Sequence, residues 1–425
     1  MFPNPQDALP LPASPSLERY KKIAKELVAA CKSDNIAGWS REWVEGLVRL
    51  SGVTFGRGLP ANPGRWIDKV EDFARRTLRG KCTLTAAQFV IARSHGFESW
   101  PKFAKHLRKS ESRFEKAADA IVTGDIETLK KLLREDPNLV HARSTREHGA
   151  TLLIYVSANG VEGYRQKSPP NIVEITKLLL DAGAEVDAIC DVYGGGCTTL
   201  GLTATSVHPE KAGVQEPLMQ LLLDRGASLE KPSGGYGQSI VSSCLANGRP
   251  RAAAYLANRG ARVGLKEAAG LGRLEDVQKF ADDATSEQLQ EAFRYACAYG
   301  SRAVVEFLLD KGVDIAAAGS DGHTPLHWAV ITGHLEIVKF MLQYHPPLEA
   351  RNMYGGTVLG QTLWSAAHGG DPDRYIAILE ELVAAGAKIP ERHVPVNARV
   401  DAWLKEHGSE PEPKWYWYGE KPSAR

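Results

Sequence analysis

The stretch DGHTPLHWAVITGHLEIVKFML, residues 321–342, holds three histidines within twelve positions and decides how the rest of the chain is interpreted. His327 follows Thr-Pro-Leu, and proline is well tolerated in the first turn of a helix, so we expect a helix to begin here. His323 precedes this helix, and His334 lies in the Gly-His turn after it. His323 and His327 therefore do not share one helical face, as an i, i+4 zinc pair would. The stretch predicts a scaffold element, with a metal or catalytic site as the alternative.

A similar helix ending recurs along the chain, in which leucines are followed by Gly-Ala or a close variant. The glycines at 226 and 260 are 34 residues apart, and the 52-residue step from 260 to 312 fits one full unit plus a short one at 265–283. A period near 33 residues indicates an array of helix pairs, none of which buries its apolar face without its neighbours. The matching endings are LLLDAGA (178–184), LLLDRGA (221–227), YLANRGA (255–261), FLLDKGV (307–313) and ELVAAGA (381–387).

Residues 321–342 closely resemble the ankyrin consensus D-G-x-T-P-L-H-x-A followed by G-H-L-E-I-V-K. The resemblance covers about 114–390, and the first unit (114–143) departs from it by having DPNLV where Gly-Ala is usual. It implies that His327 bonds neighbouring backbone and braces adjacent fingers. Residues 84–107 also resemble a helical module that precedes ankyrin arrays in bacterial proteins. The resemblance therefore implies an all-α solenoid of helix pairs with short hairpin fingers.

Four segments are expected in this chain. Residues 1–16 carry five prolines and should form an extended tail, because proline fixes φ and removes a hydrogen-bond donor. A helical module should follow at 17–110, and the repeat array at 114–390. Residues 391–425 should cap the array, with Val400, Trp403 and Leu404 facing inwards. Within them, PKWYWYG (413–419) either packs on the last repeat or acts as a docking peptide or plug.

Composition excludes several classes of protein. Hydrophobic residues make up 43% of the chain and charged residues 24%, the balance of an ordinary soluble folded protein. A net charge of +1 gives no global attraction to nucleic acid or to an anionic membrane. No apolar run approaches the roughly 18 residues needed to span a bilayer, and the N-terminus lacks the features of a secretory signal. Six cysteines without a C-x-x-C pair favour free thiols in a reducing compartment, so we expect a cytoplasmic protein.

Three turns between paired helices are longer than the single His334 of the reference unit. Insertions in a repeat array fall on one face of the solenoid, so we expect these turns to wall a concave groove, or else to be solvated loops. The turns are 161–172, 208–215 and 367–375. They contribute the candidate partner-binding residues Tyr164, Arg165, His208, Lys211 and His368.

The finger tips carry tyrosine beside glycine. Tyr193, Tyr236 and Tyr354 recur near one position of the unit. Aromatic side chains that lose little entropy are effective binding anchors, although tyrosines at these positions can instead pack between fingers. Together with Trp328 and Trp364 they complete the set of candidate partner-binding residues.

No motif in the chain establishes catalysis. The sequence lacks a P-loop, G-x-S-x-G and H-E-x-x-H. His208 shares a loop with Glu210 and Lys211, but the sequence does not show that such groups converge on a substrate. No catalytic residue, metal or cofactor is therefore assigned. An enzyme or small-molecule site in the glycine-rich groove stays as an alternative.

Residues 65–109 contain eleven Lys or Arg and four acidic residues, a local charge of +7. Such a face can meet nucleic acid or an acidic partner, or it can be solvated. The charges are spread over several predicted helices without a DNA-reading motif, which favours solvation. The predicted function is non-catalytic recognition of another protein through the concave groove. A nucleic-acid adaptor is the second alternative.

Overall fold

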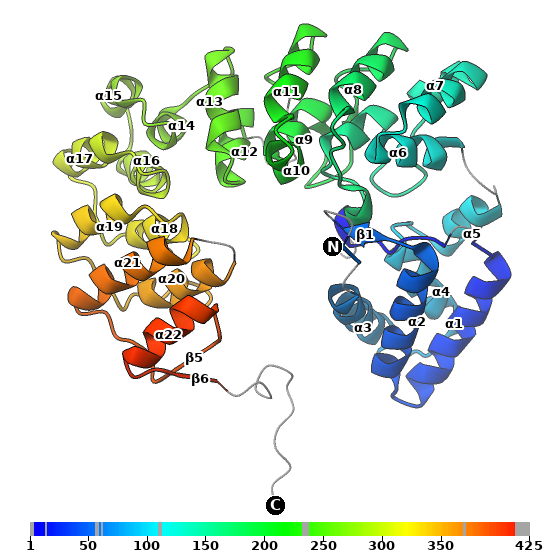
Figure 1. Cartoon of the computed structure of the whole chain (residues 1–425), viewed down its shortest axis with the longest axis horizontal. Helices are drawn as coiled ribbons and strands as arrows, with labels where there is room; N and C mark the ends of the chain where they lie inside the picture. The colour runs from blue at the N-terminus through cyan, green and yellow to red at the C-terminus, as the bar shows by residue number, and fades with distance from the viewer. Residues whose placement is uncertain are drawn as a thin grey trace, which may run out of the picture. The chain divides into compact units, whose positions relative to one another are not determined.

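The computed structural model describes residues 4–12, 15–55, 59–60, 63–108, 113–231, 238–368 and 371–412. Along these residues the protein is mostly helical, as predicted, with three short two-stranded pairings (Figure 1). The chain divides into two compact units, residues 1–262 (unit 1) and 263–425 (unit 2). This boundary falls inside the predicted array, where nothing in the repeat pattern marks it. None of the helices described is long and apolar enough to cross a membrane.

Unit 1 begins with a helical module whose core is aromatic. Tyr20, Phe97 and Phe103 are almost completely buried, and the rings of Tyr20 and Phe103 meet edge to face at 4.9 Å. The β1 and β2 strands pair antiparallel. The elements are α1 (Leu17–Lys32), α2 (Ile36–Ser51), β1 (Thr54–Phe55), β2 (Leu59–Pro60), α3 (Gly64–Leu78), α4 (Leu84–Ser94) and α5 (Trp100–Arg108).

Residues 4–12 are not the free extended tail that their prolines predict. A short 3-10 turn, η1 (Pro5–Asp7), leads into Ala8 and Leu9, and the side chains of Asp7, Ala8 and Leu9 are buried. The Leu9 N–H donates to the Ser94 carbonyl at 2.7 Å, and the Leu9 carbonyl lies 3.1 Å from His95 Nδ1. Because the residues between the prolines keep their donors and acceptors, this segment, termed the N-terminal arm (residues 4–9), docks on the module.

Two of the six cysteines are not the free thiols that the sequence predicts. Cys31 and Cys82 form a disulfide, with Cα atoms 5.7 Å apart, while Cys190, Cys197, Cys244 and Cys297 are free and buried. The bonded pair is 51 residues apart in sequence. The two cysteines lie close together because α1 packs against α4. The spacing of cysteines along the sequence does not reveal this contact.

The rest of unit 1 is built from repeats. The first inner elements pack in the order α6, η3, α9 and α12, and the outer helices α8, α11 and α13 pack in turn. One inner element, η3, is a 3-10 helix in place of the expected α-helix. The elements are α6 (Arg113–Thr123), α7 (Ile126–Glu135), η2 (Pro137–His141), η3 (Leu152–Ser157), η4 (Gly163–Arg165), α8 (Ile172–Asp181), β3 (Ile189–Cys190), β4 (Cys197–Thr198), α9 (Thr199–Thr205), α10 (Val207–Lys211), α11 (Gln215–Asp224), α12 (Ile240–Ala246) and α13 (Pro250–Asn258).

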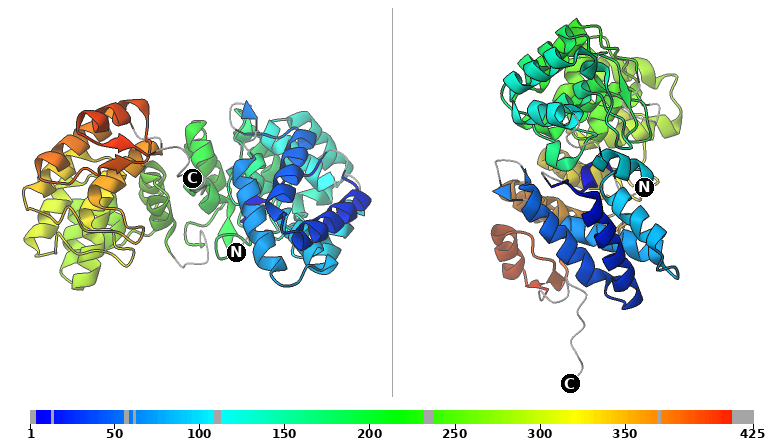
Figure 2. Two further views of the ribbon diagram at one scale, coloured as in Figure 1. Left: turned by 90° about the horizontal axis from the view of Figure 1, so that it is seen from below. Right: turned by 90° about the vertical axis from the view of Figure 1, so that its right-hand side faces the viewer.

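Unit 2 continues the array and ends in a cap. Helix α16 packs against α14 and α18, and α18 packs against α20. Helix α22 lies against α21, shown in red and orange in Figure 2, and buries Val400, Trp403 and Leu404 as predicted. The elements are α14 (Leu265–Gly270), α15 (Leu274–Ala281), α16 (Ser286–Ala298), α17 (Arg302–Asp310), α18 (Pro325–Ile331), α19 (Leu335–Leu342), α20 (Val358–Ala367), α21 (Pro372–Ala384), β5 (Arg392–His393), α22 (Ala398–Glu406) and β6 (Glu410–Pro411), with β5 and β6 parallel. The aromatic segment 413–419 lies outside the described residues.

Local chemistry explains the repeat boundaries. Thr198, Thr324 and Thr357 precede inner helices, and each side chain accepts a hydrogen bond from the backbone N–H three residues on. Gly226 and Gly312 follow outer helices with φ of 89° and 84°, a conformation that favours glycine. The threonine and glycine signals of the sequence therefore mark real helix ends.

His323 and His327 of the stretch 321–342 are part of the scaffold. His327 is fully buried, its Nδ1 lies 2.8 Å from Thr324 Oγ1, and its Nε2 lies 3.3 Å from the Gly356 carbonyl of the next finger. This confirms the predicted brace between fingers. His323 is buried against Asn352, whose Nδ2 lies 3.1 Å from His323 Nε2.

Candidate recognition site

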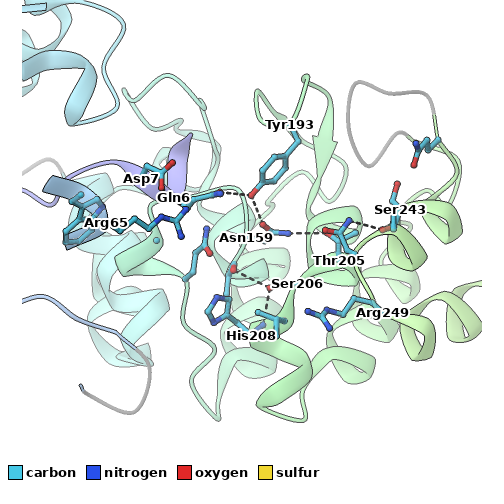
Figure 3. Close-up of a pocket in the computed structure, with 18 residues that line it drawn as sticks. Gln6, Asp7, Arg65, Asn159, Tyr193, Thr205, Ser206, His208, Ser243 and Arg249 are labelled. Atoms are coloured by element: carbon cyan, nitrogen blue, oxygen red, sulfur yellow. Dashed lines mark hydrogen bonds and ion pairs between the residues drawn. The ribbon is translucent and has the colours of Figure 1, made fainter. Parts of the chain in front are cut away.

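A cavity of about 800 Å³ opens in unit 1 between the helical module and the inner elements of the repeats (Figure 3). Its lining is rich in side-chain amides and hydroxyls. The N-terminal arm contributes Gln6 and Asp7, and the module contributes Arg65 and Trp66. The repeats contribute Ala158, Asn159, Gly163, Gln166, Tyr193, Thr205, Ser206, Val207, His208, Gln238, Ser243, Ala246, Asn247 and Arg249.

Short polar residues at the ends of successive inner elements line the repeat side of the cavity. Asn159 follows η3, Thr205 ends α9, and Asn247 follows α12. Asn159 Nδ2 donates to the Leu202 carbonyl at 3.3 Å and to Thr205 Oγ1 at 3.1 Å, which holds its amide in place. Because these side chains are short, the space in front of them stays open.

Tyr193 joins the two sides of the cavity. It lies in the finger between β3 and β4 with a φ of 49°, a left-handed conformation unusual for a tyrosine. Its hydroxyl is 2.9 Å from both Gln6 Oε1 and Asn159 Oδ1, and it donates its single proton to one of them at a time (Figure 3). Burial raises the pKa of Tyr193 to about 12, so the phenol stays protonated. The side chain keeps 38% of its surface exposed.

The charged side chains of the lining are partly neutralised in place. The Asp7 carboxylate, only 3% exposed, accepts from Arg65 Nη2 at 3.0 Å and from Lys69 Nζ at 2.5 Å. Arg249 Nη1 lies 2.9 Å from Glu210 Oε2. Burial, helped by Lys211 and Arg249, lowers the pKa of His208, so its imidazole is neutral at pH 7. These groups suit a polar ligand bound through hydrogen bonds.

The lengthened turn at 161–172 contributes less to the groove wall than expected, because its charged residues Glu162 and Arg165 are buried. Arg165 is buried, with Nη1 2.7 Å from Glu115 Oε2 and Nε 2.8 Å from Asp119 Oδ1. The Tyr164 hydroxyl accepts from Arg146 Nη2 at 3.2 Å. Arg165 therefore anchors the turn to α6, and Tyr164 anchors it to the loop before η3. Only Gly163 and Gln166 from this turn line the cavity.

This anchor is a buried ion network. Glu162, with no exposed surface, forms ion pairs with both Arg146 and Arg165. Burial alone would raise the pKa of Glu115, but Arg165 and Arg146 outweigh it and lower that pKa to about 2. The network is thus ionised at neutral pH. The sequence gives no sign of it, because its members come from α6, the loop before η3 and the lengthened turn.

The remaining candidate residues are dispersed. Lys211 is exposed at the end of α10 and does not line the cavity, and Tyr236 lies outside the described residues. Tyr354, Trp328, Trp364 and His368 belong to unit 2. Of the predicted residues that the structure describes, the cavity brings together Tyr193 and His208.

Several cavity residues were missed by sequence reasoning. The Asn-Gly pairs at 159–160 and 247–248 recur at the same place in two repeats, and this was a usable signal. No local signal was available for Gln6 and Asp7. Their position depends on the docking of the N-terminal arm.

Comparison with known proteins finds ankyrin repeats in part of the chain. A family model of ankyrin repeats in three copies matches residues 265–352. The ankyrin repeat and KH domain-containing protein mask-1 of Caenorhabditis elegans is 31% identical over 217 residues, 51% of this chain and 7% of the relative. The ankyrin repeat and KH domain-containing protein CBG24701 of Caenorhabditis briggsae is 33% identical over 296 residues, 64% of this chain and 10% of the relative.

A third relative is the ankyrin repeat and SAM domain-containing protein 6 of Danio rerio, 27% identical over 197 residues, 39% of this chain and 26% of the relative. The chain thus spans about a quarter or less of the length of these curated relatives.

Proposed function

Because this chain is an ankyrin repeat protein, we propose that it is a non-catalytic scaffold that binds another protein through the polar cavity of unit 1. Ankyrin arrays share a scaffold and have no common ligand, so the partner's chemistry must be inferred from the cavity itself.

The amides of the lining carry this proposal. Asn159 and Asn247 come from two repeats that flank the α9 repeat, and Gln166 and Gln238 also line the cavity. A side-chain amide both donates and accepts hydrogen bonds, as a peptide group does, so several amides in one cavity can pair with a peptide backbone. Cavities for small ligands are lined predominantly by apolar groups, whereas polar and apolar groups share this lining about equally.

The charges favour a segment that is neutral or acidic. Arg65 and Arg249 line the cavity, and the one lining carboxylate, Asp7, is already paired with two cations. A basic segment would find no free counter-charge among the lining residues described. The half-exposed ring of Tyr193 supplies an aromatic anchor of the kind that dominates binding energy in protein interfaces.

The test is affinity capture from native lysate. The bait is the wild type, a Tyr193→Phe/Asn247→Ala double variant, or Lys211→Ala as a control whose side chain lies outside the cavity. Loss of two hydrogen-bonding groups should weaken partner binding about tenfold, whereas the control should bind normally. Capture of the same proteins in equal amounts by all three baits would contradict the proposal.

A small polar molecule is a second candidate for the same cavity. The N-terminal arm and α3 close one side of it, and a volume of about 800 Å³ falls in the range of small-ligand pockets. Mass spectrometry of the denatured, filtered protein distinguishes the two. A stoichiometric metabolite with no captured protein would favour this candidate.

The nucleic-acid alternative receives little support. Many of the cations in 65–109 are paired with carboxylates, which reduces the field that a phosphate backbone would meet. The paired residues are Arg65, Lys69, Arg75, Arg76, Arg93 and Lys102.

A cytoplasmic location is also part of the proposal, and the cysteines give it two opposed arguments. Four buried free thiols fit a reducing compartment, whereas the Cys31–Cys82 disulfide is typical of an oxidising one. Thiol alkylation in intact cells followed by mass spectrometry decides. Six alkylated cysteines in the denatured protein mean that Cys31 and Cys82 are reduced in the cell, which supports the cytoplasm. Four alkylated cysteines mean that the disulfide is formed, which contradicts it.

A further inference from the structure

The side chain of Gln6 occupies the polar cavity, although it belongs to the N-terminal arm. It lines the cavity, and its Oε1 lies 2.9 Å from the Tyr193 hydroxyl. Figure 3 shows this side chain extended towards Tyr193, with Asn159 beside the same hydroxyl. The cavity thus already holds a short piece of peptide, which the chain itself contributes and which is bound through a side-chain amide.

The backbone of Gln6 lies directly against the lengthened turn of the repeats. A Cβ added to Gly163 would lie 2.5 Å from the Gln6 carbonyl oxygen, well inside van der Waals contact. Gly163 belongs to η4 and lines the cavity. The absence of a side chain at position 163 is therefore what lets the arm come so close to the repeats.

Other contacts of the arm are made with the helical module. The Leu9 N–H donates to a module carbonyl at 2.7 Å, and the Asp7 carboxylate pairs with Arg65 and Lys69 of α3. None of these contacts involves the Gln6 side chain. Gln6 can consequently leave the cavity by rotating its own side chain, while the rest of the arm stays docked on the module.

Tyr193 loses little when Gln6 leaves. Its hydroxyl is also 2.9 Å from Asn159 Oδ1, so its single proton has an acceptor in either state. The Asn159 amide is held in place, because its Nδ2 donates to Thr205 Oγ1 at 3.1 Å. The state with Gln6 in the cavity is thus favoured by one hydrogen bond between neutral groups, which corresponds to a population ratio of about ten.

A side-chain amide suits this position because it carries both a donor and an acceptor. Its carbonyl can accept the Tyr193 proton, or its N–H can donate to the Tyr193 oxygen while that proton goes to Asn159. A carboxylate could only accept, and it would compete with Asn159 for the same proton. An apolar side chain would make neither bond. A segment that displaces Gln6 should therefore offer an amide of its own.

We propose that Gln6 is an internal ligand of the polar cavity, which an extended partner segment displaces by placing a glutamine side chain against Tyr193. This inference rests on the function proposed for the cavity, and it adds the chemistry of the partner and its control by the arm. The apparent affinity for such a segment is reduced to the extent that Gln6 occupies the cavity. Removal of the Gln6 amide should therefore tighten binding.

The test uses two pentapeptides with blocked ends, Ala-Ala-Gln-Ala-Ala and Ala-Ala-Met-Ala-Ala, titrated with the full chain. Ligand-observed NMR follows the titration, since it measures weak binding. Methionine matches glutamine in length but lacks the amide. The glutamine peptide should bind the Gln6→Ala variant up to about tenfold more tightly than the wild type. The methionine peptide should show no such gain.

Further variants locate the effect. Gly163→Ala should move the arm backbone away and should also tighten the glutamine peptide, whereas Gly46→Ala, whose added Cβ meets nothing within 4 Å, should bind as the wild type does. Tyr193→Phe, introduced into Gln6→Ala, should remove the gain. The denaturation midpoint of Gln6→Ala should stay near that of the wild type, because the arm keeps its contacts with the module.

Three results would overturn the proposal. They are equal affinity of the glutamine peptide for the wild type and Gln6→Ala, an equal gain for the methionine peptide, and a gain that survives Tyr193→Phe. Absence of glutamine-peptide binding to both proteins would overturn it as well. These titrations use defined peptides and need no native partner, so their failure is distinguishable from a failure to capture a protein from lysate, which would contradict the function proposed for the cavity.

Discussion

The two units use the same scaffold position for opposite chemistry. Ser243 lies five residues before Gly248 in unit 1, as Trp328 lies five residues before Gly333 in unit 2. The Ser243 side chain lines the polar cavity, whereas the Trp328 ring is half-buried and lies 5.3 Å from that of His323. Stacking of the repeats constrains the buried positions and leaves these exposed ones free to differ. Recognition in this protein should therefore be read from equivalent exposed positions, one repeat at a time.

The units also differ in how the site is supported. In unit 1 the N-terminal arm reaches the finger through Gln6, and a buried ion network holds the lengthened turn. In unit 2 the brace comes from the repeat motif itself, through His327 and the Gly356 carbonyl. Unit 1 thus depends on contacts between distant segments, and three perturbations confined to it test that difference.

Removal of the disulfide should have the largest effect. Cys31→Ser with Cys82→Ser opens a loop of 51 residues and should lower the free energy of unfolding of unit 1 by about 4 kcal/mol. Chemical denaturation of the oxidised protein and the variant measures the change. A Cys297→Ser control in unit 2 should leave unit 1 unaffected, and an unchanged stability of the double variant would show that the bond does not form.

A substitution in the ion network should have the next largest effect. Glu162→Gln keeps the side-chain shape but leaves Arg146 and Arg165 buried without this counter-charge, which should cost about 3 kcal/mol. Amide hydrogen exchange should become faster in residues 113–172 and should stay unchanged in unit 2. The exposed Glu127→Gln is the matched control. Equal loss of protection in both units would contradict the claim that the ion network supports unit 1 alone.

Mild acid should destabilise unit 1 by a smaller amount. Burial lowers the pKa of His95 from 6.5 to about 3, so as the pH falls the unfolded chain binds a proton that the folded chain does not. Stability contributed by the neutral ring is therefore lost progressively below pH 6.5. At pH 5 the loss should be about 2 kcal/mol. Denaturation midpoints between pH 7.5 and 5 measure it, and a His95→Gln variant should show a flatter dependence; an identical slope would exclude His95 as the cause.

Much of the fold can be predicted from local sequence motifs. The Thr-Pro-Leu-His motif predicts both the start of α18 and the brace made by His327, and the apolar spacing of Val400, Trp403 and Leu404 predicts the cap. These features need only residues within one turn or one repeat. The sequence therefore allowed the repeat architecture to be predicted with little ambiguity.

Less of the candidate site could be predicted from the sequence. Arg165 reads as an exposed loop residue because its partners Glu115 and Asp119 lie some fifty residues earlier in the chain. The position of Gln6 beside Tyr193 joins segments 187 residues apart. Such contacts depend on how the module docks on the repeats, and neither periodicity nor composition encodes that docking.

The most direct test of protein binding by unit 1 is amide hydrogen exchange of the chain alone and in the complex captured from native lysate. The account predicts added protection at 158–166, 191–195 and 243–249, the segments that form the polar cavity. It predicts no change at Lys211 and the exposed end of α10. Protection that leaves all three cavity segments unchanged would contradict the assignment of the cavity as the partner site.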